Sequence, residues 1–420
     1  MPPRRTPRTL LAIPAVLAFL GLAPTVLPTP TPTSAQAPAS APSPGPRTLK
    51  SAPSTAPQTP TPPVGPQTPK STPPTGSRPL TPPAPAKPQA PAAPVAPVAA
   101  VTPATAAALT LLVAQGKAPA AALLAQDDSG TRFADAGDGI DRSDHFRAGS
   151  ITKTFIATVV LQLAAEHRLS LSDTVDAHLP GLVSGAGNDG SRLTLRALLT
   201  HTSGLYDFTA DTLGTVPVTP RQAIRIALTH PPAAPGHYAY SNTNYVLLGM
   251  VIEQVTGNSY ATETERRILT PLRLTGTSFP GARTSLPSPH GRAYAADGSD
   301  VTELDPRVAG AAGELVTTLA DLDRFYGALL AGELLPPGQL REMLDTRAAH
   351  GSYGMGLYPV KLPCGTTVWG HNGRISGSYV RTAATVDGRH VLTFRVNTDG
   401  IADPDLEPAL LAAEFCPRTE

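Results

Sequence analysis

Residues 146–153 read Phe146-Arg147-Ala148-Gly149-Ser150-Ile151-Thr152-Lys153, and they lead directly into an apolar stretch. The apolar positions 155, 156, 159, 160 and 163 recur with the spacing of one helix face. A helix that begins near Ser150 would set Ser150 and Lys153 on that helix one turn apart, with Cβ atoms roughly 5–6 Å apart. The lysine amine would then reach the serine hydroxyl. A helix cap at Ser150 with a solvated Lys153 is the structural alternative.

The composition of the 420 residues divides the chain into unequal parts. Residues 38–103 consist mostly of Pro, Ala, Thr and Ser, and such a segment cannot bury enough apolar surface to offset the entropy of ordering. We therefore expect a disordered linker over 38–103 and one folded domain over 104–420. The formal net charge of +1 provides no basic field, so we expect no nucleic-acid partner. Separately, we expect the protein to be a monomer.

The N-terminus has the order of an export signal. Three arginines precede an apolar run over 10–27, and small residues follow as far as Ala37. We expect a signal peptide over 1–37 and a secreted or cell-wall-associated protein. An uncleaved membrane anchor is the alternative, although Pro14 and Pro24 interrupt the run.

Hydrophobic periodicity and turn residues predict the order of helices and strands. Strand patterns occur at both ends of the domain, and helical patterns lie between them. This order predicts an α+β fold, in which helices flank an antiparallel sheet and a helical subdomain is inserted. The expected elements are helices over 103–113, 150–167, 193–199, 221–228, 245–255 and 405–415, and strands over 120–126, 131–136, 315–317, 368–371, 379–386 and 390–397, the last two joined by a two-residue turn at Asp387-Gly388.

Two further motifs, each found once, follow Ser-x-x-Lys along the chain: Tyr240-Ser241-Asn242 and His371-Asn372-Gly373. A serine hydroxyl becomes a useful nucleophile only when a base removes its proton. A lysine can do so if burial lowers its pKa from roughly 10.4 toward about 7–8, and a tyrosine phenolate is the competing base. The sequence leaves both open. A glycine at 373 would let a substrate approach the strand closely.

From about residue 104 to 420 the chain resembles the serine β-lactamase-like and penicillin-binding hydrolases, for which Ser-x-x-Lys is a signature. Within them it resembles the secreted D-alanyl-D-alanine carboxypeptidases of actinomycetes. This resemblance implies the β-lactamase/transpeptidase-like fold. It is carried by the three motifs and by segments 198–205, 240–245, 249–253, 271–275, 353–357 and 369–373.

The resemblance also implies roles for the residues of the first two motifs. Ser150 would be the acylated nucleophile, and Lys153 would be its hydrogen-bonded partner. Tyr240 would act as general base and proton shuttle, and Asn242 would contact the substrate amide. His201, which stands in a conspicuous motif, is expected to orient a turn by hydrogen bonds instead of acting in catalysis.

The third motif departs from the usual His-Thr-Gly of this branch. His371 stands where many relatives carry lysine, and Asn372 replaces the threonine, which would alter the contact to a substrate carboxylate. Arg374 could bind that carboxylate, narrow the cleft or point to solvent. The backbone N–H groups of Ser150 and Arg374 would form the oxyanion hole.

Cys364 and Cys416 are the only cysteines, and in an exported protein an isolated pair is most simply one disulfide. The resemblance implies the same pairing. No metal-ligand spacing occurs among the histidines, so we expect neither a metal nor a cofactor.

The three motifs predict a serine acyl-transfer enzyme, and the resemblance implies a serine-type D-Ala-D-Ala carboxypeptidase that removes terminal D-alanine from peptidoglycan peptides and is acylated by β-lactams. An esterase, a D-amino-acid peptidase or a β-lactamase could use the same three motifs on small esters or amides. A β-lactam or peptide sensor without turnover is the alternative from another class.

Overall fold

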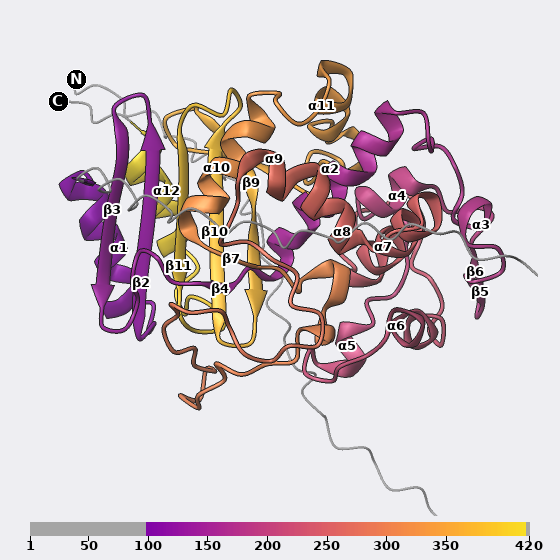
Figure 1. Ribbon diagram of the computed structural model, residues 1–420, viewed down its shortest axis with the longest axis horizontal. Coiled ribbons are helices and arrows are strands. Elements are labelled where there is room, and N and C mark those ends of the chain that lie inside the picture. Colours follow the sequence, from indigo (N-terminus) through magenta and orange to yellow (C-terminus); the bar gives the residue numbers. More distant parts are fainter. Residues whose placement is uncertain (1–97, 417–420) are drawn as a thin grey trace, which may run out of the picture. The chain divides into compact units, whose positions relative to one another are not determined.

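A computed structural model describes residues 98–416, so the predicted signal peptide and most of the predicted linker lie outside the described residues. The described chain contains a seven-stranded sheet in the order β1-β3-β2-β11-β10-β9-β8. Figure 1 shows this sheet beside a largely helical region. Among the described residues, every helix is too short or too polar to span a membrane.

Neighbouring strands of the large sheet are antiparallel, except that the short β1 runs parallel to β3. The predicted α+β class is therefore confirmed, and the sheet is mixed only at β1. The edge strand β8 was not predicted. The strands are β1 (Ala99–Ala100), β2 (Ala120–Asp127), β3 (Gly130–Gly137), β8 (Tyr358–Lys361), β9 (Thr367–Ile375), β10 (Ser378–Thr385) and β11 (Val391–Val396), with the small pairs β4 (Phe146–Arg147) with β7 (Val316–Thr317) and β5 (Ser184–Gly185) with β6 (Asn188–Asp189).

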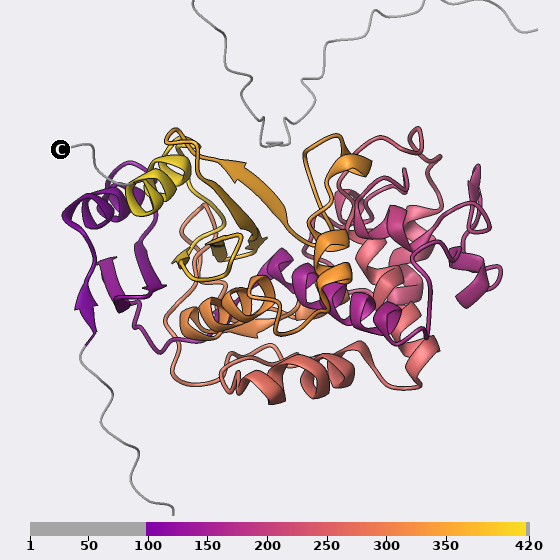
Figure 2. The same cartoon turned by 90° about the horizontal axis from the view of Figure 1, so that it is seen from above.

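Helices cover both faces of the sheet. The first and last helices, α1 (Pro103–Ala114) and α12 (Leu406–Phe415), lie side by side on one face (Figure 2). On the other face α10 (Leu319–Leu330) packs against the strands, and its Phe325 ring stacks at 3.7 Å on Phe155 of α2 (Thr152–Ala165). Alternate residues of β2 enter the two cores, because successive side chains of a strand point to opposite faces.

The predicted inserted helical region is present between α2 and α10. Its centre is α7 (Asn242–Thr256), which contacts α2, α4 and α6. A π-helical turn over Glu265–Leu269 separates α8 from α9. The remaining helices are α3 (Val175–His178), α4 (Leu195–Leu199), α5 (Thr209–Thr212), α6 (Pro220–Ala227), α8 (Tyr260–Thr264), α9 (Thr270–Leu272) and, after α10, α11 (Pro337–Met343).

Two local predictions are corrected by the structure. The turn at Asp387-Gly388 is part of a longer loop over 386–390, in which the Asp387 carboxylate accepts hydrogen bonds from the Thr385 hydroxyl and the Arg389 N–H. The helix predicted to begin near Ser150 is α-helical only from Thr152, because residues 149–151 form a 3₁₀ turn.

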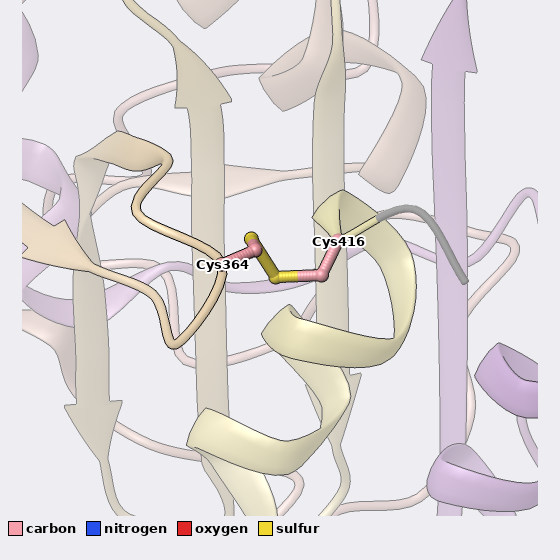
Figure 3. The surroundings of a disulfide bond; sticks show 2 residues. All are labelled: Cys364 and Cys416. Carbon is pink, nitrogen blue, oxygen red and sulfur yellow. A yellow bond between two sulfur atoms is a disulfide. The ribbon is translucent and has the colours of Figure 1, made fainter. Parts of the chain in front are cut away.

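The disulfide Cys364–Cys416 is present as predicted, with the two Cα atoms 5.7 Å apart. Figure 3 shows that it joins the loop before β9 to the end of α12. The last helix is thereby linked covalently to the loop that leads into the strand with the third motif.

Candidate active site

The turn that carries Ser150 lies directly against β9. A Cβ atom added at Gly149, whose φ is +51°, would come within 2.8 Å of the Arg374 backbone nitrogen. A Cβ atom at Gly373 would lie 1.8 Å from the Ala148 carbonyl oxygen. Both positions therefore require glycine. In the structure Gly373 makes room for the turn of the candidate nucleophile, and its predicted part in letting a substrate approach the strand stays a prediction.

The edge of β9 beside this turn is not covered by a strand. Among the described residues, β8 pairs with β9 only from Thr367 to Gly370, so residues 371–375 keep one edge toward the Ser150 turn. The Arg374 backbone N–H is thus brought beside that turn. The predicted oxyanion hole needs the Ser150 and Arg374 N–H groups to face one developing charge, and the close approach of this turn to β9 brings the two backbones together.

Lys153 is fully buried in the first turn of α2, and its Nζ atom contacts three oxygen atoms. These are Ser150 Oγ at 2.9 Å, Asn242 Oδ1 at 2.8 Å and the Ala312 carbonyl oxygen at 2.7 Å. Burial lowers the Lys153 pKa to about 7, partly offset by the attraction of Asp207. A neutral amine is therefore available near neutral pH.

The acceptors around Lys153 determine where the lone pair of the neutral amine points. A carbonyl oxygen such as that of Ala312 can only accept, and the amide oxygen of Asn242 also accepts. Two N–H groups of a neutral amine satisfy these atoms, which leaves the lone pair for the Ser150 hydroxyl. The neutral Lys153 amine is therefore oriented to accept the proton of the Ser150 hydroxyl.

Tyr240 contacts the same serine, since its hydroxyl donates a hydrogen bond to Ser150 Oγ at 2.8 Å. Desolvation raises the Tyr240 pKa well above its ordinary value. Because 36 % of the residue remains exposed, water limits this rise, but its direction still disfavours a phenolate. The hydroxyl is therefore placed as a proton donor to Ser150 Oγ when Lys153 is neutral.

Asn242 is the first residue of α7, and both ends of its side-chain amide are occupied by protein groups. The oxygen faces Lys153, and the Nδ2 atom donates to Asp207 Oδ2 and Thr209 Oγ1, both at 3.0 Å. The predicted contact with a substrate amide would have to compete with these bonds. Asp207 and Thr209 were not predicted individually; they follow directly after the conspicuous segment 198–205.

His201 holds the loop that carries Tyr240. Its carbonyl oxygen accepts the Ala239 N–H at 2.8 Å, and its Nδ1 atom accepts the Ser241 N–H at 3.2 Å. Its ring lies 4.2 Å from the Tyr240 ring. Burial lowers the His201 pKa well below its ordinary value, so the ring is neutral. These contacts have the turn-orienting geometry that was predicted for His201.

His371 is buried behind the site and is held by Tyr353. Its Nδ1 atom contacts the Asn372 carbonyl oxygen, which can only accept, so Nδ1 carries the proton. Nε2 then accepts the Tyr353 hydroxyl at 2.8 Å. Burial and the nearby Lys153 lower the His371 pKa to about 3. The imidazole therefore offers no positive charge to a substrate. Tyr353 was not predicted individually, although it begins segment 353–357.

The structure does not bring the Asn372 side chain to Ser150. Residues alternate along β9, so Asn372 points to the α12 side of the sheet while Gly373 faces the Ser150 turn. The Asn372 amide accepts a hydrogen bond from the Tyr358 hydroxyl at 3.2 Å and donates to Tyr379 at 3.4 Å. Its predicted contact with a substrate carboxylate is not supported. Arg374 lies on the same side as Asn372 and is exposed.

Comparison with known families gives one extensive match. A model of the family described as Beta-lactamase matches residues 57–414. The match begins inside the predicted linker, in a part of the chain outside the described residues. Penicillin-binding protein 4 of Amycolatopsis lactamdurans is 29 % identical over 300 residues, which are 65 % of this chain and 77 % of that protein. The chain spans only 53 % of the length of a second relative, the putative penicillin-binding protein PbpX of Bacillus subtilis, and 28 % of the length of protein flp of Staphylococcus aureus.

Two solved structures are similar over almost their whole length. A D-stereospecific amidohydrolase from Streptomyces sp. is 42 % identical, with a TM-score of 0.70 over 74 % of this chain and 98 % of that chain. The D-amino acid amidase from Ochrobactrum anthropi SV3, solved with L-phenylalanine amide, is 25 % identical, with a TM-score of 0.66 over 74 % and 97 % of the two chains.

Proposed function

The chain belongs to the Beta-lactamase family of serine hydrolases, and from this premise we propose that it hydrolyses the amide bond of D-aminoacyl substrates through an acyl-enzyme on Ser150. The contact that carries the proposal is that of the buried Lys153 Nζ with Ser150 Oγ at 2.9 Å. The 42 % identity to a D-stereospecific amidohydrolase supports the choice of substrate class.

In the proposed reaction the neutral Lys153 amine removes the Ser150 hydroxyl proton as Oγ attacks the substrate carbonyl carbon. The negative charge on the carbonyl oxygen is stabilised by the N–H groups of Ser150 and Arg374. The Tyr240 hydroxyl donates a proton to the leaving amine. The proton that Lys153 took from Ser150 then replaces it, so that Lys153 and Tyr240 are both neutral in the acyl-enzyme. Water then attacks the ester, its proton passes to the same groups, and Ser150 Oγ leaves with a proton.

The charges beside Ser150 favour an amide over a peptide that ends in a free carboxylate. Such a carboxylate needs a cation or several hydrogen-bond donors. His371 is neutral, because its pKa is lowered to about 3, and Asn372 points to the other side of the sheet. A leaving group without charge, such as ammonia or an amine, needs no such partner.

The D-Ala-D-Ala carboxypeptidase is the second candidate, and Arg374 favours it. Arg374 follows Gly373 at the end of β9, is exposed, and forms no ion pair with any of residues 98–416. Its side chain leaves β9 on the same side as Asn372, so a terminal carboxylate could use its guanidinium only by way of the open edge of the strand.

One substrate panel tests the proposal. The protein is incubated with D-phenylalanine amide, L-phenylalanine amide, a peptide ending in D-Ala-D-Ala and a fluorescent penicillin. Ammonia, D-alanine and the mass of any adduct are measured. We expect ammonia from the D-amide at a rate at least about ten times that from the L-amide, since the two place the scissile carbonyl differently.

The controls separate the competing activities. Replacing Ser150 with Ala should abolish turnover, whereas Ser172→Ala, at an exposed serine, should not change it. Faster release of D-alanine than of ammonia would establish the carboxypeptidase instead. An adduct without turnover of any substrate would identify a sensor, and turnover by the Ser150→Ala variant would refute the mechanism.

Export from the cytoplasm remains part of the proposal. The leader over 1–37 has the composition of a signal, and the Cys364–Cys416 disulfide is typical of oxidising compartments. N-terminal sequencing of the protein from culture medium and cell wall tests this. An intact Met1 on membrane-bound protein would instead favour an anchor.

A further inference from the structure

We propose that Asp207 is a positioning residue, which fixes the amide orientation of Asn242 and thereby aims the Lys153 lone pair at Ser150. This inference deepens the proposed function and rests on Lys153 acting as the base. Asp207 lies between Leu205 and α5, outside the three motifs.

The Asp207 carboxylate is held from its own loop. Its Oδ1 atom accepts the Thr209 N–H at 3.0 Å and the Thr209 hydroxyl at 2.8 Å. Its Oδ2 atom lies 3.0 Å from Asn242 Nδ2. The loop is also fastened to the first turn of α7, because Thr243 Oγ1 accepts the Phe208 N–H and donates to the Tyr206 carbonyl oxygen.

This contact fixes which end of the Asn242 amide faces Lys153. A carboxylate only accepts hydrogen bonds, so Nδ2 must face Asp207 and Oδ1 must face Nζ. If the amide were reversed, its N–H₂ group would stand 2.8 Å from Nζ. An ammonium would then meet a donor, and a neutral amine would turn its lone pair toward Asn242 and away from Ser150.

Asp207 is also the acid that faces Lys153 through this amide. The other titratable groups around Lys153 are His201, His371, Tyr240 and Tyr245, and the pKa shifts of all four favour the neutral form. Asp207 raises the Lys153 pKa against the effect of burial. Its removal should therefore move the pH dependence of acylation, which a purely structural residue would not do.

An exchange of the two side chains tests the inference. In Asp207→Asn, the new amide keeps its oxygen on the two Thr209 donors and presents an N–H₂ group to Asn242, which must reverse. In Asn242→Asp, two carboxylates face each other. In the double variant Asp207→Asn/Asn242→Asp, the amide donates to the new carboxylate and the carboxylate accepts from Lys153, so the hydrogen bonds from residue 207 to residue 242 and from residue 242 to Lys153 are both restored. The bond that Asn242 donates to Thr209 Oγ1 is lost.

The readout is the pre-steady-state rate of Ser150 acylation by p-nitrophenyl acetate between about pH 5 and pH 10. This activated ester reports on Lys153 whether or not the D-amide is the true substrate, so failure of the proposed function and failure of this inference remain distinguishable. Asp211→Asn is the matched control, because Asp211 lies in the same segment but contacts Tyr206 and His230 instead of Asn242.

We expect each single variant to lose at least about 100-fold in acylation rate, the size of a general-base contribution, and the control to remain within about threefold of wild type. The double variant should recover at least about tenfold over either single variant at high pH. The acylation rate of the double variant should rise at a higher pH than that of the wild type, because a carboxylate in direct contact raises the Lys153 pKa.

Three results would overturn the inference. The first is an Asp207→Asn variant whose acylation rate lies within about threefold of the wild-type rate. The second is a double variant that is acylated no faster than the single variants. The third is a double variant whose acylation rate rises over the same pH range as that of the wild type. If Asp207→Asn does not fold, the double variant decides alone, since it retains the shapes and the net charge of the wild-type pair. Its failure to fold would also contradict the inference, which requires the two side chains to be exchangeable.

Discussion

At the scale of single residues, the site keeps its bases neutral by burial. Lys153, His201 and His371 are buried, and the pKa of each is lowered. A neutral Lys153 can accept a proton, whereas neutral imidazoles provide shape and hydrogen bonds without charge.

The first residue-scale prediction concerns Lys153. Because only its neutral form can accept the Ser150 proton, the acylation rate should rise with pH through about 7 and level off above it. Stopped-flow measurement of acylation from about pH 5 to pH 9.5 tests this. Lys153→Arg, whose guanidinium stays protonated, should be inactive throughout. A rate that does not level off and is still rising at about pH 9.5 would point to a Tyr240 phenolate as the base instead.

The second residue-scale prediction concerns His371 and stability. Its pKa is about 3 in the folded protein and about 6.5 in the unfolded chain, so between these values only the unfolded chain binds the proton. The free energy of unfolding should therefore fall as pH falls below about 6.5, by up to about 1.4 kcal/mol per pH unit from this group. Urea unfolding of His371→Gln should show a shallower decline. An equal decline in both proteins would assign the effect to other groups.

Ser150, Lys153 and Tyr240 could be located from sequence because each stands in a short motif with its own chemistry. Asp207 could not, because its function depends on which end of the Asn242 amide it contacts. Asn372 was assigned a substrate contact that its position on the strand does not support, because the motif gives residue order but not the register that decides which face a side chain takes.

At the scale of elements, the site depends on β9 lying against the 3₁₀ turn of Ser150. The long helices and the β2–β3 hairpin were predictable from local periodicity and turn residues. The edge strand β8 was missed because it is short and contains Pro359. The β10–β11 connection was predicted too short because Asp387 closes a wider loop through its side chain.

The element-scale prediction is that Gly373→Ala separates β9 from the turn. The added Cβ would lie 1.8 Å from the Ala148 carbonyl oxygen, so the strand must shift, at a cost of about 1–3 kcal/mol in stability. Acylation should fall in parallel because the Arg374 N–H moves with the strand. The matched control is Gly400→Ala, where an added Cβ meets no atom within 4 Å. Normal acylation by Gly373→Ala would show that the oxyanion hole lies elsewhere.

At the scale of the whole molecule, the sheet brings together segments from distant parts of the sequence. Residues of β2 pair with residues of β11, as in Leu124 with Thr393. Sequence patterns indicated both strands but not their pairing, because partners so far apart leave no local signal. The disulfide was predictable because the chain has two cysteines and one possible intramolecular pairing.

The molecule-scale prediction concerns that disulfide, which closes a loop with a sequence separation of 52. By the chain-entropy relation, its loss should lower the free energy of unfolding by about 4 kcal/mol. Urea unfolding of Cys364→Ser/Cys416→Ser should show this decrease, and a reductant should then have no further effect on the double variant. Rapid alkylation of both cysteines in the untreated protein would instead contradict the disulfide.

The pairing of β2 with β11 also determines when the protein can fold during synthesis. The middle of the sheet stays incomplete until β11, which ends at Val396, has left the ribosome, although the β2–β3 hairpin emerged long before. At a synthesis rate of roughly 5–20 residues per second, β11 emerges on the order of ten seconds or more after the β2–β3 hairpin. The growing chain is thus kept from closing its core early, and an unclosed chain is the form that can be threaded through a narrow pore.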